Sequence, residues 1–400
     1  MAKPRPARDV IVVGGGPAGA AAAVMLKQRG HDVLLLDEAR FPRDKVCGEG
    51  VSPEAWRLIE ELGATRAVQD LAPYPLRGMA VTAADGTCFR GDYRGAARPG
   101  FAVRRVRFDR VLLDRARAAG VEVREGMKAT GLLQREGTVE GVTGVNGGGP
   151  EVLRARLVIG ADGRRSVVAR RLGLLREHRR LRKFAVRGYW EGMEGLEERG
   201  EMHGGGGGYC GVAPLSPTRA NVTFVLDRRE MAAAGGGLEG FYRRTLRRWP
   251  RIAERLEKAR LLSAPRAVGP LALEASRVSA PGALLVGDAA GFYDPFTGEG
   301  VTLALRSAEL AAAVADRCLR AGSFRDVGEY DRVRHAATRY KFRFNRLLQV
   351  VVGRPWLANA AARRLARRPD LADRLVSIAG DFVPARTALG PGFLLDLLTS

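Results

Sequence analysis

The N-terminal stretch changes its hydrophobic pattern twice within a short distance. Val10–Val13 is a continuous apolar run without alternation, which is the pattern of a strand buried on both faces of a parallel sheet. Ala20–Gln28 is rich in alanine, and Gly30 follows it. Val33–Leu36 is apolar again and ends in Asp37. The pattern predicts a strand, a helix and a second strand.

A second unit of the same kind lies far along the chain. The apolar run "ALLV" precedes "GDAAGFYDPFTGEG" at Gly287–Gly300, and "VTLALRSAELAAAVADRCL" follows with helical spacing. Between the two units, Leu157–Ile159 is another short apolar strand, and Asp162–Gly163 makes the turn after it. These strands are expected to belong to one parallel sheet.

The middle of the chain has a different pattern. "RKFAVRGYW" and "RANVTFVLD" alternate between apolar and polar residues, which predicts antiparallel strands half exposed to a cavity. His203–Gly208 is predicted to be a flexible loop, and Phe241–Leu262 a helix. From Glu329 the chain is expected to be largely helical and basic, with an apolar stripe that either packs on the protein or lies on a membrane.

Composition narrows the classes of partner. The chain has 400 residues, with 66 basic and 44 acidic side chains and a net charge of +22. The excess is mostly arginine spread along the whole length, and aromatic residues make up 6%. This distribution favours dispersed surface charge, with an anionic ligand or membrane surface as the alternative, over nucleic-acid binding.

The cysteines predict a reduced protein without a metal site. Cys47, Cys88, Cys210 and Cys318 form no C-x-x-C pair and do not combine with the four histidines at metal-ligand spacing. The first ten residues lack an apolar signal segment, and no uncharged apolar run reaches the ~18 residues that span a bilayer. We therefore expect a cytoplasmic protein that meets a membrane only peripherally.

The turn between the first predicted strand and the first predicted helix, which we call the first turn, carries the pattern Gly-x-Gly-x-x-Gly. It follows a predicted strand and opens a predicted helix, which is the context that dinucleotide binding requires. Glycine lets the backbone approach a pyrophosphate at the helix N-terminus, and a carboxylate at the end of the second strand accepts hydrogen bonds from the adenosine ribose. The predicted binding residues are Gly14, Gly16, Pro17, Ala18, Gly19, Asp37 and Glu38.

A second match to the pattern, Gly235–Gly240, serves as a control. It follows "EMAAA", which does not read as a strand, and no acidic residue ends a strand about twenty positions later. We interpret this second match as a chance turn.

The second turn favours FAD over NAD. Asp288 stands at a strand end, where its carboxylate can accept a hydrogen bond from the ribityl chain that FAD has. The loop "PFTGEG" is small enough to lie against a flat ring, and the helix after it points its N-terminus inward. A positive helix end stabilises the negative charge of a reduced flavin. The predicted residues are Asp162, Gly287, Asp288, Pro295, Gly298, Gly300 and Val301.

One basic residue also stands at a helix entrance. Arg105 lies three residues before Phe108–Asp109, and a cation at that position could reach a pyrophosphate, although an arginine in such a position is more often solvated.

Taken together, these motifs resemble the FAD-dependent oxidoreductases of the para-hydroxybenzoate hydroxylase fold. Within that fold the chain looks most like the geranylgeranyl reductases and their relatives, the flavin-dependent halogenases. The matching segments run in the same order from residue 9 to about 310, and they are "GGGPAG", "FPRDKVCGEGVSP", the R-x-x-F-D of Arg105–Asp109, "GADG" and "GDAAGFYDPFTGEG".

The resemblance implies an α/β fold with a Rossmann-like FAD-binding domain of the glutathione-reductase type. That domain would be discontinuous, over residues 1–75, 100–175 and 268–330. An antiparallel-sheet substrate domain would comprise 76–99 and 176–267, and a helical C-terminal region 331–400.

The resemblance also assigns roles to residues. Asp37 would bind the ribose, Arg105 the pyrophosphate, and Asp288 the ribityl chain or pyrophosphate. The backbone of Gly298–Val301 would meet the pyrimidine edge of the flavin. The "KVCGEG" segment would border the flavin near the substrate, which makes Cys47 a candidate catalytic residue, although a merely packed cysteine explains it equally well.

The chain departs from the reductase pattern at one strand. Geranylgeranyl reductases commonly carry Tyr-x-Trp-x-Phe-Pro there, whereas this chain has "YCGVAP". Tyr209 and Pro214 remain, but Gly211 and Ala213 replace the two large aromatic residues. This indicates a bulkier or differently shaped substrate, or a different reaction. The Trp-x-Trp-x-Ile-Pro stretch of tryptophan-type halogenases is also missing.

The sequence therefore predicts an oxidoreductase with non-covalently bound FAD and a hydrophobic small-molecule substrate. The favoured reaction is reduction of an isoprenoid-like double bond, with a proton from Tyr209, Cys47 or water. The alternatives are monooxygenation through a flavin C4a-hydroperoxide, halogenation, and a non-catalytic FAD-bound assembly module. Electrons would come from NAD(P)H or from a separate reductase or ferredoxin, because no second dinucleotide motif is present.

Overall fold

The N-terminal strand lies in the middle of the first of two large sheets. This computed structural model describes residues 7–178, 182–232, 237–292, 294–388 and 390. The order in the first sheet is β20-β21-β11-β1-β2-β8, and β1 runs parallel to both β11 and β2. The bounds are β1 Arg8–Val13, β2 Val33–Asp37, β8 Glu122–Glu125, β9 Lys128–Arg135, β10 Thr138–Asn146, β11 Gly149–Gly160, β20 Ser279–Ala280 and β21 Ala283–Leu285.

Burial explains the pattern of the central strands. Val10, Ile11 and Val12 are completely buried, as a parallel strand covered on both faces requires. Helix α1 packs against α4 and α9, and its alanines allow this close approach. The helices next to this sheet are α1 Pro17–Gln28, α2 Ala55–Glu61, α3 Thr65–Gln69, α4 Arg105–Ala118, α5 Val167–Arg171, α9 Gly300–Ala321 and α10 Glu329–Val352.

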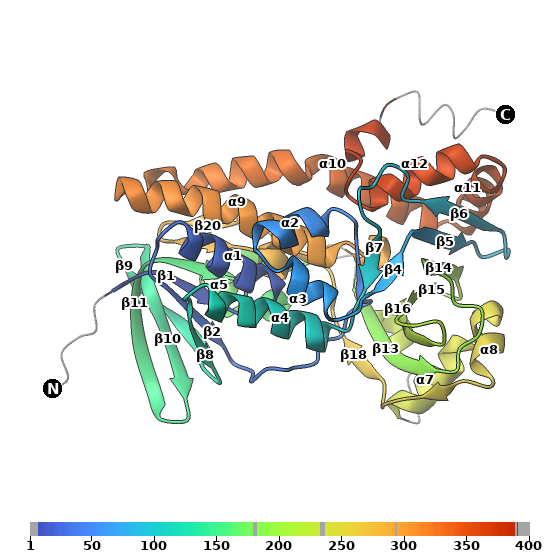
Figure 1. The fold of residues 1–400 in the computed structure, drawn as a ribbon, viewed down its shortest axis with the longest axis horizontal. Helices are drawn as coiled ribbons and strands as arrows, with labels where there is room; N and C mark the ends of the chain where they lie inside the picture. The colour runs from blue at the N-terminus through green and yellow to red at the C-terminus, as the bar shows by residue number, and fades with distance from the viewer. Residues whose placement is uncertain (1–6, 179–181, 233–236, 293, 389, 391–400) are drawn as a thin grey trace.

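The second large sheet is mostly antiparallel and is shown on the right of Figure 1. Its order is β17-β13-β16-β15-β14-β5-β6, with β18 also paired to β13. The two strands predicted from alternation, β13 and β16, pair along their whole length. The bounds are β5 Gly78–Thr82, β6 Cys88–Asp92, β13 Lys183–Glu191, β14 Arg199–Gly205, β15 Gly208–Pro214, β16 Arg219–Asp227, β17 Arg260–Leu261 and β18 Arg266–Val268.

The remaining strands form two small sheets. β7 lies between β3 and β4, and β12 pairs with β19. The bounds are β3 Gly50–Val51, β4 Tyr74–Leu76, β7 Gly100–Ala102, β12 Leu175–Glu177 and β19 Leu273–Ala275. Short helices flank the second sheet, at α6 Arg228–Ala232, α7 Leu238–Leu246 and α8 Pro250–Leu256.

Two local predictions were wrong. His203–Gly208 is not a loop, because β14 continues to Gly205 and β15 begins at Gly208, with the two strands paired as a hairpin. The predicted helix Phe241–Leu262 is divided into α7 and α8, because Pro250 starts a new helix and cannot continue the previous one. The control match at Gly235 begins outside the described residues.

The C-terminal helices cover one edge of the second sheet. α11 Pro355–Arg367 and α12 Pro369–Ala379 lie against β5 and β6 (Figure 1). Phe344 of α10 shares a core with Phe89 of β6 and Leu371 of α12. Within the described ranges, the helices are all too short or too polar to cross a membrane. The predicted α/β fold with a helical C-terminal region is confirmed.

Candidate functional site

Backbone contacts explain two of the three glycines in the first turn. Gly14 has φ +107°, and a Cβ there would lie 2.4 Å from the Ala161 carbonyl oxygen. A Cβ on Gly19 would lie 1.8 Å from the Gly14 carbonyl oxygen. Gly16 differs, because the nearest atom to its Cβ position is Arg43 Nη2 at 3.4 Å. Two glycines therefore bring strand and helix together, whereas the third meets only the end of a flexible arginine side chain.

The carboxylate of Asp37 is held against the first turn. Its Oδ2 accepts a hydrogen bond from Gly15 N at 2.6 Å, and its Oδ1 accepts one from Ala39 N at 2.8 Å. Asp37 is buried, whereas Glu38 is exposed. The pairing of β1 with β2 places Asp37 there, as expected for neighbouring parallel strands.

Two arginines lie beside the first turn. Arg105 begins α4 and donates from Nε and Nη2 to the two carboxylate oxygens of Asp109, at 2.6 and 2.9 Å. Arg43 donates to the same buried carboxylate at 3.1 Å. Burial lowers the pKa of Arg105, but the negative charge of Asp109 raises it, and the net shift is upward. Because two arginines share one aspartate, one positive charge is left without a matching negative charge next to Gly16. Sequence reasoning missed Arg43, although it stands in the quoted "FPRDKVCGEG".

The second turn touches the first. A Cβ on Gly287, which has φ +59°, would lie 2.8 Å from Ala18 Cβ of α1. Gly298 has φ +69° and nothing within 4 Å of its Cβ position. Lys45 Nζ lies 3.6 Å from Asp288 Oδ2. Two turns that are remote in sequence therefore meet, with room beside the second one.

The two turns line one cavity of about 210 Å³. The predicted site residues that the structure brings together around it are Gly16, Pro17, Ala18, Cys47, Arg105, Tyr209, Gly287, Asp288, Gly298, Gly300 and Val301. Gly14, Gly19, Asp37 and Glu38 do not line it.

Asp162, another predicted residue, also lies off the cavity wall. The Asp162 carboxylate accepts a hydrogen bond from Val167 N at 2.6 Å, at the start of α5. The pKa of Asp162 is raised by burial. Pro295 begins a short 3-10 turn, and its side chain lies outside the described part of the structure.

These residues fit an extended, flat, anionic ligand such as FAD. The backbone at Gly16 and Gly298 leaves space, and Arg43 and Arg105 supply positive charge beside it. Helix α9 begins at Gly300, on the cavity wall, so its positive N-terminal end faces the site.

The second sheet supplies an apolar wall. Its members include Met79, Met202, Val212, Val225 and Val268. Gly211 and Ala213 also lie on this wall, and the contact nearest to a Cβ on Gly211 is Met202 Cε at 3.5 Å. The cavity is therefore wide where the resembled family carries aromatic side chains.

Tyr209 belongs to a buried polar group. Its hydroxyl donates to Asp294 Oδ1 at 2.7 Å, and Lys183 Nζ donates to Asp294 Oδ2 at 3.0 Å. Its ring packs edge-on against Phe296. Burial, and then the charge of Asp294, raises the pKa of Tyr209 well above its ordinary value. Tyr209 therefore keeps its proton. Lys183 and Asp294 were not predicted, because their partners are distant in sequence.

The Cys47 segment contains a second buried group. Glu49 N donates to Cys47 Sγ at 3.3 Å. The Glu49 side chain is completely buried, its backbone is left-handed at φ +62°, and its Oε1 accepts hydrogen bonds from Arg105 N and the Tyr189 hydroxyl. Its Oε2 has no hydrogen-bond partner in the described structure. Burial raises the pKa of Glu49, so the loop beside Cys47 holds a carboxyl group that resists ionisation.

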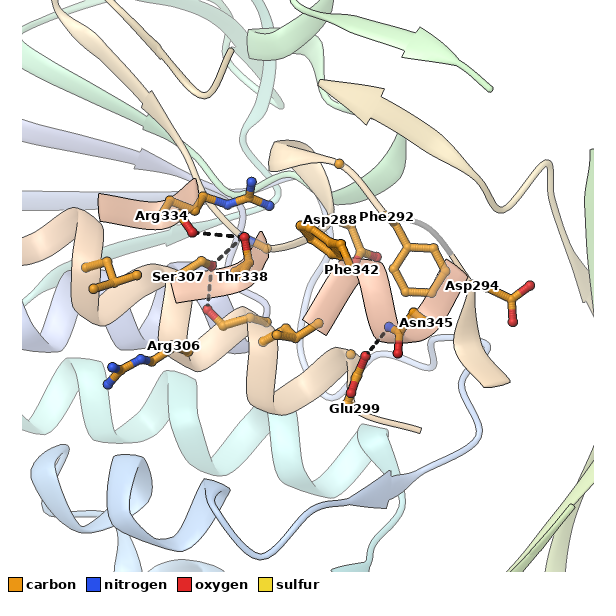
Figure 2. A pocket seen from close by; sticks show the side chains of 16 residues that line it. Asp288, Phe292, Asp294, Glu299, Arg306, Ser307, Arg334, Thr338, Phe342 and Asn345 are labelled. Atoms are coloured by element: carbon orange, nitrogen blue, oxygen red, sulfur yellow. Dashed lines mark hydrogen bonds between the residues drawn. The ribbon is translucent and has the colours of Figure 1, made fainter. Parts of the chain in front are cut away.

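A smaller cavity, of about 40 Å³, lies behind the second turn. Figure 2 shows Thr338, Phe342 and Asn345 of α10 facing the segment that carries Asp288 and Phe292. Asn345 Nδ2 donates to Glu299 Oε1 at 2.6 Å. Helix α10 therefore supports the second turn through Asn345 and Glu299.

Comparisons with known proteins agree with this geometry. The family described as an FAD binding domain matches residues 7–339. The chain is 31% identical over 325 residues to the menaquinone reductase of Mycobacterium tuberculosis, covering 77% of this chain and 76% of that protein. It is 30% identical over 321 residues to the digeranylgeranylglycerophospholipid reductase of Methanosarcina mazei, covering 78% and 76%.

A solved structure is also similar over most of the chain. CmlS, a flavin-dependent halogenase, superposes with a TM-score of 0.82 at 25% identity, covering 96% of this chain and 77% of that one. With two glycine turns around one cavity and this set of relatives, the chain belongs to the FAD binding domain family and is an FAD-dependent oxidoreductase.

Proposed function

We propose that this protein reduces a carbon–carbon double bond in an isoprenoid-like substrate. The observation that carries the proposal is the single cavity that joins both glycine turns to the apolar wall of the second sheet. One end is suited to FAD and the other to an apolar chain. The named activities of the two curated relatives, on menaquinone and on a digeranylgeranyl lipid, support this substrate class.

The residues around the cavity suggest a division of roles. Arg43 and Arg105 would hold the pyrophosphate, Asp37 the ribose and Asp288 the ribityl chain. When bound and reduced, FAD supplies the hydride. The N-terminus of α9 would stabilise negative charge on the pyrimidine edge.

The proton would come from Cys47 or water. Tyr209 already donates its proton to Asp294, so we assign it to shaping the cavity rather than to acid catalysis. Cys47 lines the cavity and lies beside Arg105, a cation that would stabilise the thiolate left after proton transfer. We propose NAD(P)H or a separate reductase as the source of electrons.

The test is a turnover assay without oxygen. Purified protein with FAD, dithionite and a polyprenyl lipid should yield a product heavier by two mass units. Cys47→Ser should slow turnover by about tenfold or more, whereas Cys88→Ser, at a half-buried cysteine outside the cavity, should not. Absence of the reduced product from every polyprenyl lipid tested would refute the proposal.

Halogenation is the second candidate, because CmlS has the same fold over most of its length. Lys45 is the lysine on the described cavity wall, but it faces Asp288. Repeating the assay with oxygen and bromide separates the reactions. Bromide-dependent products support a halogenase, and a gain of sixteen mass units supports a monooxygenase.

A further inference from the structure

Large exposed apolar side chains form two groups on the described surface. Within the described chain, they comprise two valines on the β10–β11 hairpin and three residues where α10 passes into α11. We call the second group the α10–α11 elbow, and its members are Leu347, Val350 and Trp356. Trp356 is 70% exposed, whereas Trp190 and Trp249 are each 3% exposed.

Arginines surround this elbow. Arg343, Leu347 and Val350 follow the spacing of one helical face. Arg346 and Arg354 are also exposed nearby. Only two residues separate α10 from α11, so Trp356 follows this face closely. Tryptophan with arginine-flanked apolar residues is the composition of a helix that lies at a membrane interface.

The charge of this segment has one sign. From Arg332 to Pro369 the chain contains ten arginines and one lysine but no aspartate or glutamate. A second copy of the chain would bring two such segments together with like charges opposed. An anionic bilayer surface complements the segment in both charge and polarity.

A series of hydrogen bonds connects helix α10 at the elbow to the wall of the main cavity. Gln349, next to Val350, accepts a hydrogen bond from Lys183 Nζ at 2.5 Å. Lys183 contacts Asp294, which accepts the hydrogen bond from Tyr209 on the cavity wall. A membrane seated on the elbow would thus lie near the compartment that we assign to an apolar substrate.

We propose that the α10–α11 elbow docks on the surface of an anionic phospholipid bilayer. Leu347, Val350 and Trp356 enter the interface, and the neighbouring arginines face lipid phosphates. The inference deepens the proposed function, because it gives the enzyme a place to meet a lipid-like substrate.

The test is vesicle sedimentation with the full chain loaded with FAD. Wild type should bind phosphatidylcholine vesicles that contain phosphatidylglycerol, and bind pure phosphatidylcholine vesicles at least tenfold less. The double variant Val350→Ser/Trp356→Ser should bind the anionic vesicles at least tenfold less than wild type. The matched control is Val145→Ser/Val152→Ser, which removes the other exposed apolar pair, at 38% and 62% exposure, and should bind like wild type.

Tryptophan emission gives a second measurement. Adding anionic vesicles should shift the emission of wild type to shorter wavelength, and Trp356→Phe should abolish the shift. Three results overturn the proposal: no binding by wild type, equal binding by the two double variants, or self-association of wild type that Val350→Ser/Trp356→Ser abolishes. Because no substrate is present, failure here is distinct from failure of the reductase proposal.

Discussion

The two glycine turns reach similar shapes by different physical means. In the first, a side chain on Gly14 would collide with the backbone of Ala161, and one on Gly19 with the backbone of Gly14. In the second, Gly298 has open space around it. The first turn is fixed by packing of neighbouring segments, so its glycines are structural as well as functional. The second turn needs contacts with other segments to hold its shape.

Lysines from three distant segments supply that support. The chain has seven lysines among its 66 basic residues. Three of these pair with the acidic residues of the second turn, as Lys45–Asp288, Lys183–Asp294 and Lys341–Glu299. A lysine is a compact point charge, whereas arginine demands a planar fork of partners. The second turn is therefore held in place by ion pairs to lysines from other parts of the fold.

Removing the cation of Lys341 should have the largest effect. Lys341 is buried between Glu299 and Asp381, and it also donates to the carbonyl oxygen of Ile378. Lys341→Met would leave the carboxyl groups of Glu299 and Asp381 without their cation, which we expect to cost about 4 kcal/mol of unfolding free energy. Urea denaturation measures this cost.

The control for that variant is Arg339→Met on the exposed face of the same helix, α10. It should change the unfolding free energy by less than about 0.5 kcal/mol. If Lys341→Met cost no more than the control, the buried cluster would not support the second turn.

Substituting one glycine in each turn should separate stability from cofactor binding. Gly19→Ala places a methyl group 1.8 Å from the Gly14 carbonyl oxygen, which we expect to cost about 3 kcal/mol. Gly298→Ala meets open space but has φ +69°, so it should cost about 1 kcal/mol. Because its methyl group would enter the space assigned to FAD, it should weaken FAD binding. Urea denaturation and FAD titration measure the two effects, and equal losses of stability would contradict the contrast between the turns.

The contrast also explains how far the sequence could predict the site. The first turn was recognisable because its glycines and Asp37 form one strand–helix–strand pattern, although the contact that requires Gly14 is with the distant Ala161. The glycines and Asp288 of the second turn were found in the same way. Lys183 and Lys341 were not, because each lies in a different element, far along the chain from the acidic residue it pairs with.

Local patterns also failed where pairing decided the structure. The glycine-rich stretch His203–Gly208 looks like a loop by composition, yet β14 and β15 pair across it as a hairpin. Propensity is a weak guide when the neighbouring strands supply the hydrogen bonds. The domain boundaries stay predictions.

Truncating Asp288 should affect the cofactor more than the fold. Its carboxylate lies in the second turn, 3.6 Å from Lys45 and partly exposed to the cavity. Asp288→Ala should weaken FAD binding by about tenfold, the loss expected for one hydrogen bond to a charged group. FAD titration by fluorescence measures this. The control is Asp316→Ala, at a partly buried contact between α9 and His31, and retention of full FAD affinity by Asp288→Ala would contradict the assignment.

The last effect should appear as a change in pH dependence. Burial raises the pKa of Asp381 from 3.8 to about 7, although Lys341 opposes the shift. The unfolded chain releases this proton near pH 4, whereas the folded protein keeps it until about pH 7. The folded state therefore binds more protons in this window, and the contribution of Asp381 to stability falls as the pH rises through it. Asp381→Asn should remove this slope, which urea denaturation at pH 5, 6 and 7 would detect.

Asp370→Asn is the matched control for this slope. Asp370 is exposed on α12, and its hydrogen bond with Arg368 lowers its pKa, so it titrates below the window. Its variant should keep the slope of wild type between about pH 5 and pH 7. If wild type instead gained stability relative to Asp381→Asn as the pH rose, the Asp381 carboxylate would be charged in the folded state. The attraction of the Asp381 carboxylate to Lys341 would then outweigh the cost of burying its charge. The second turn would be held by ion pairs alone, with no protonated carboxyl group in the cluster.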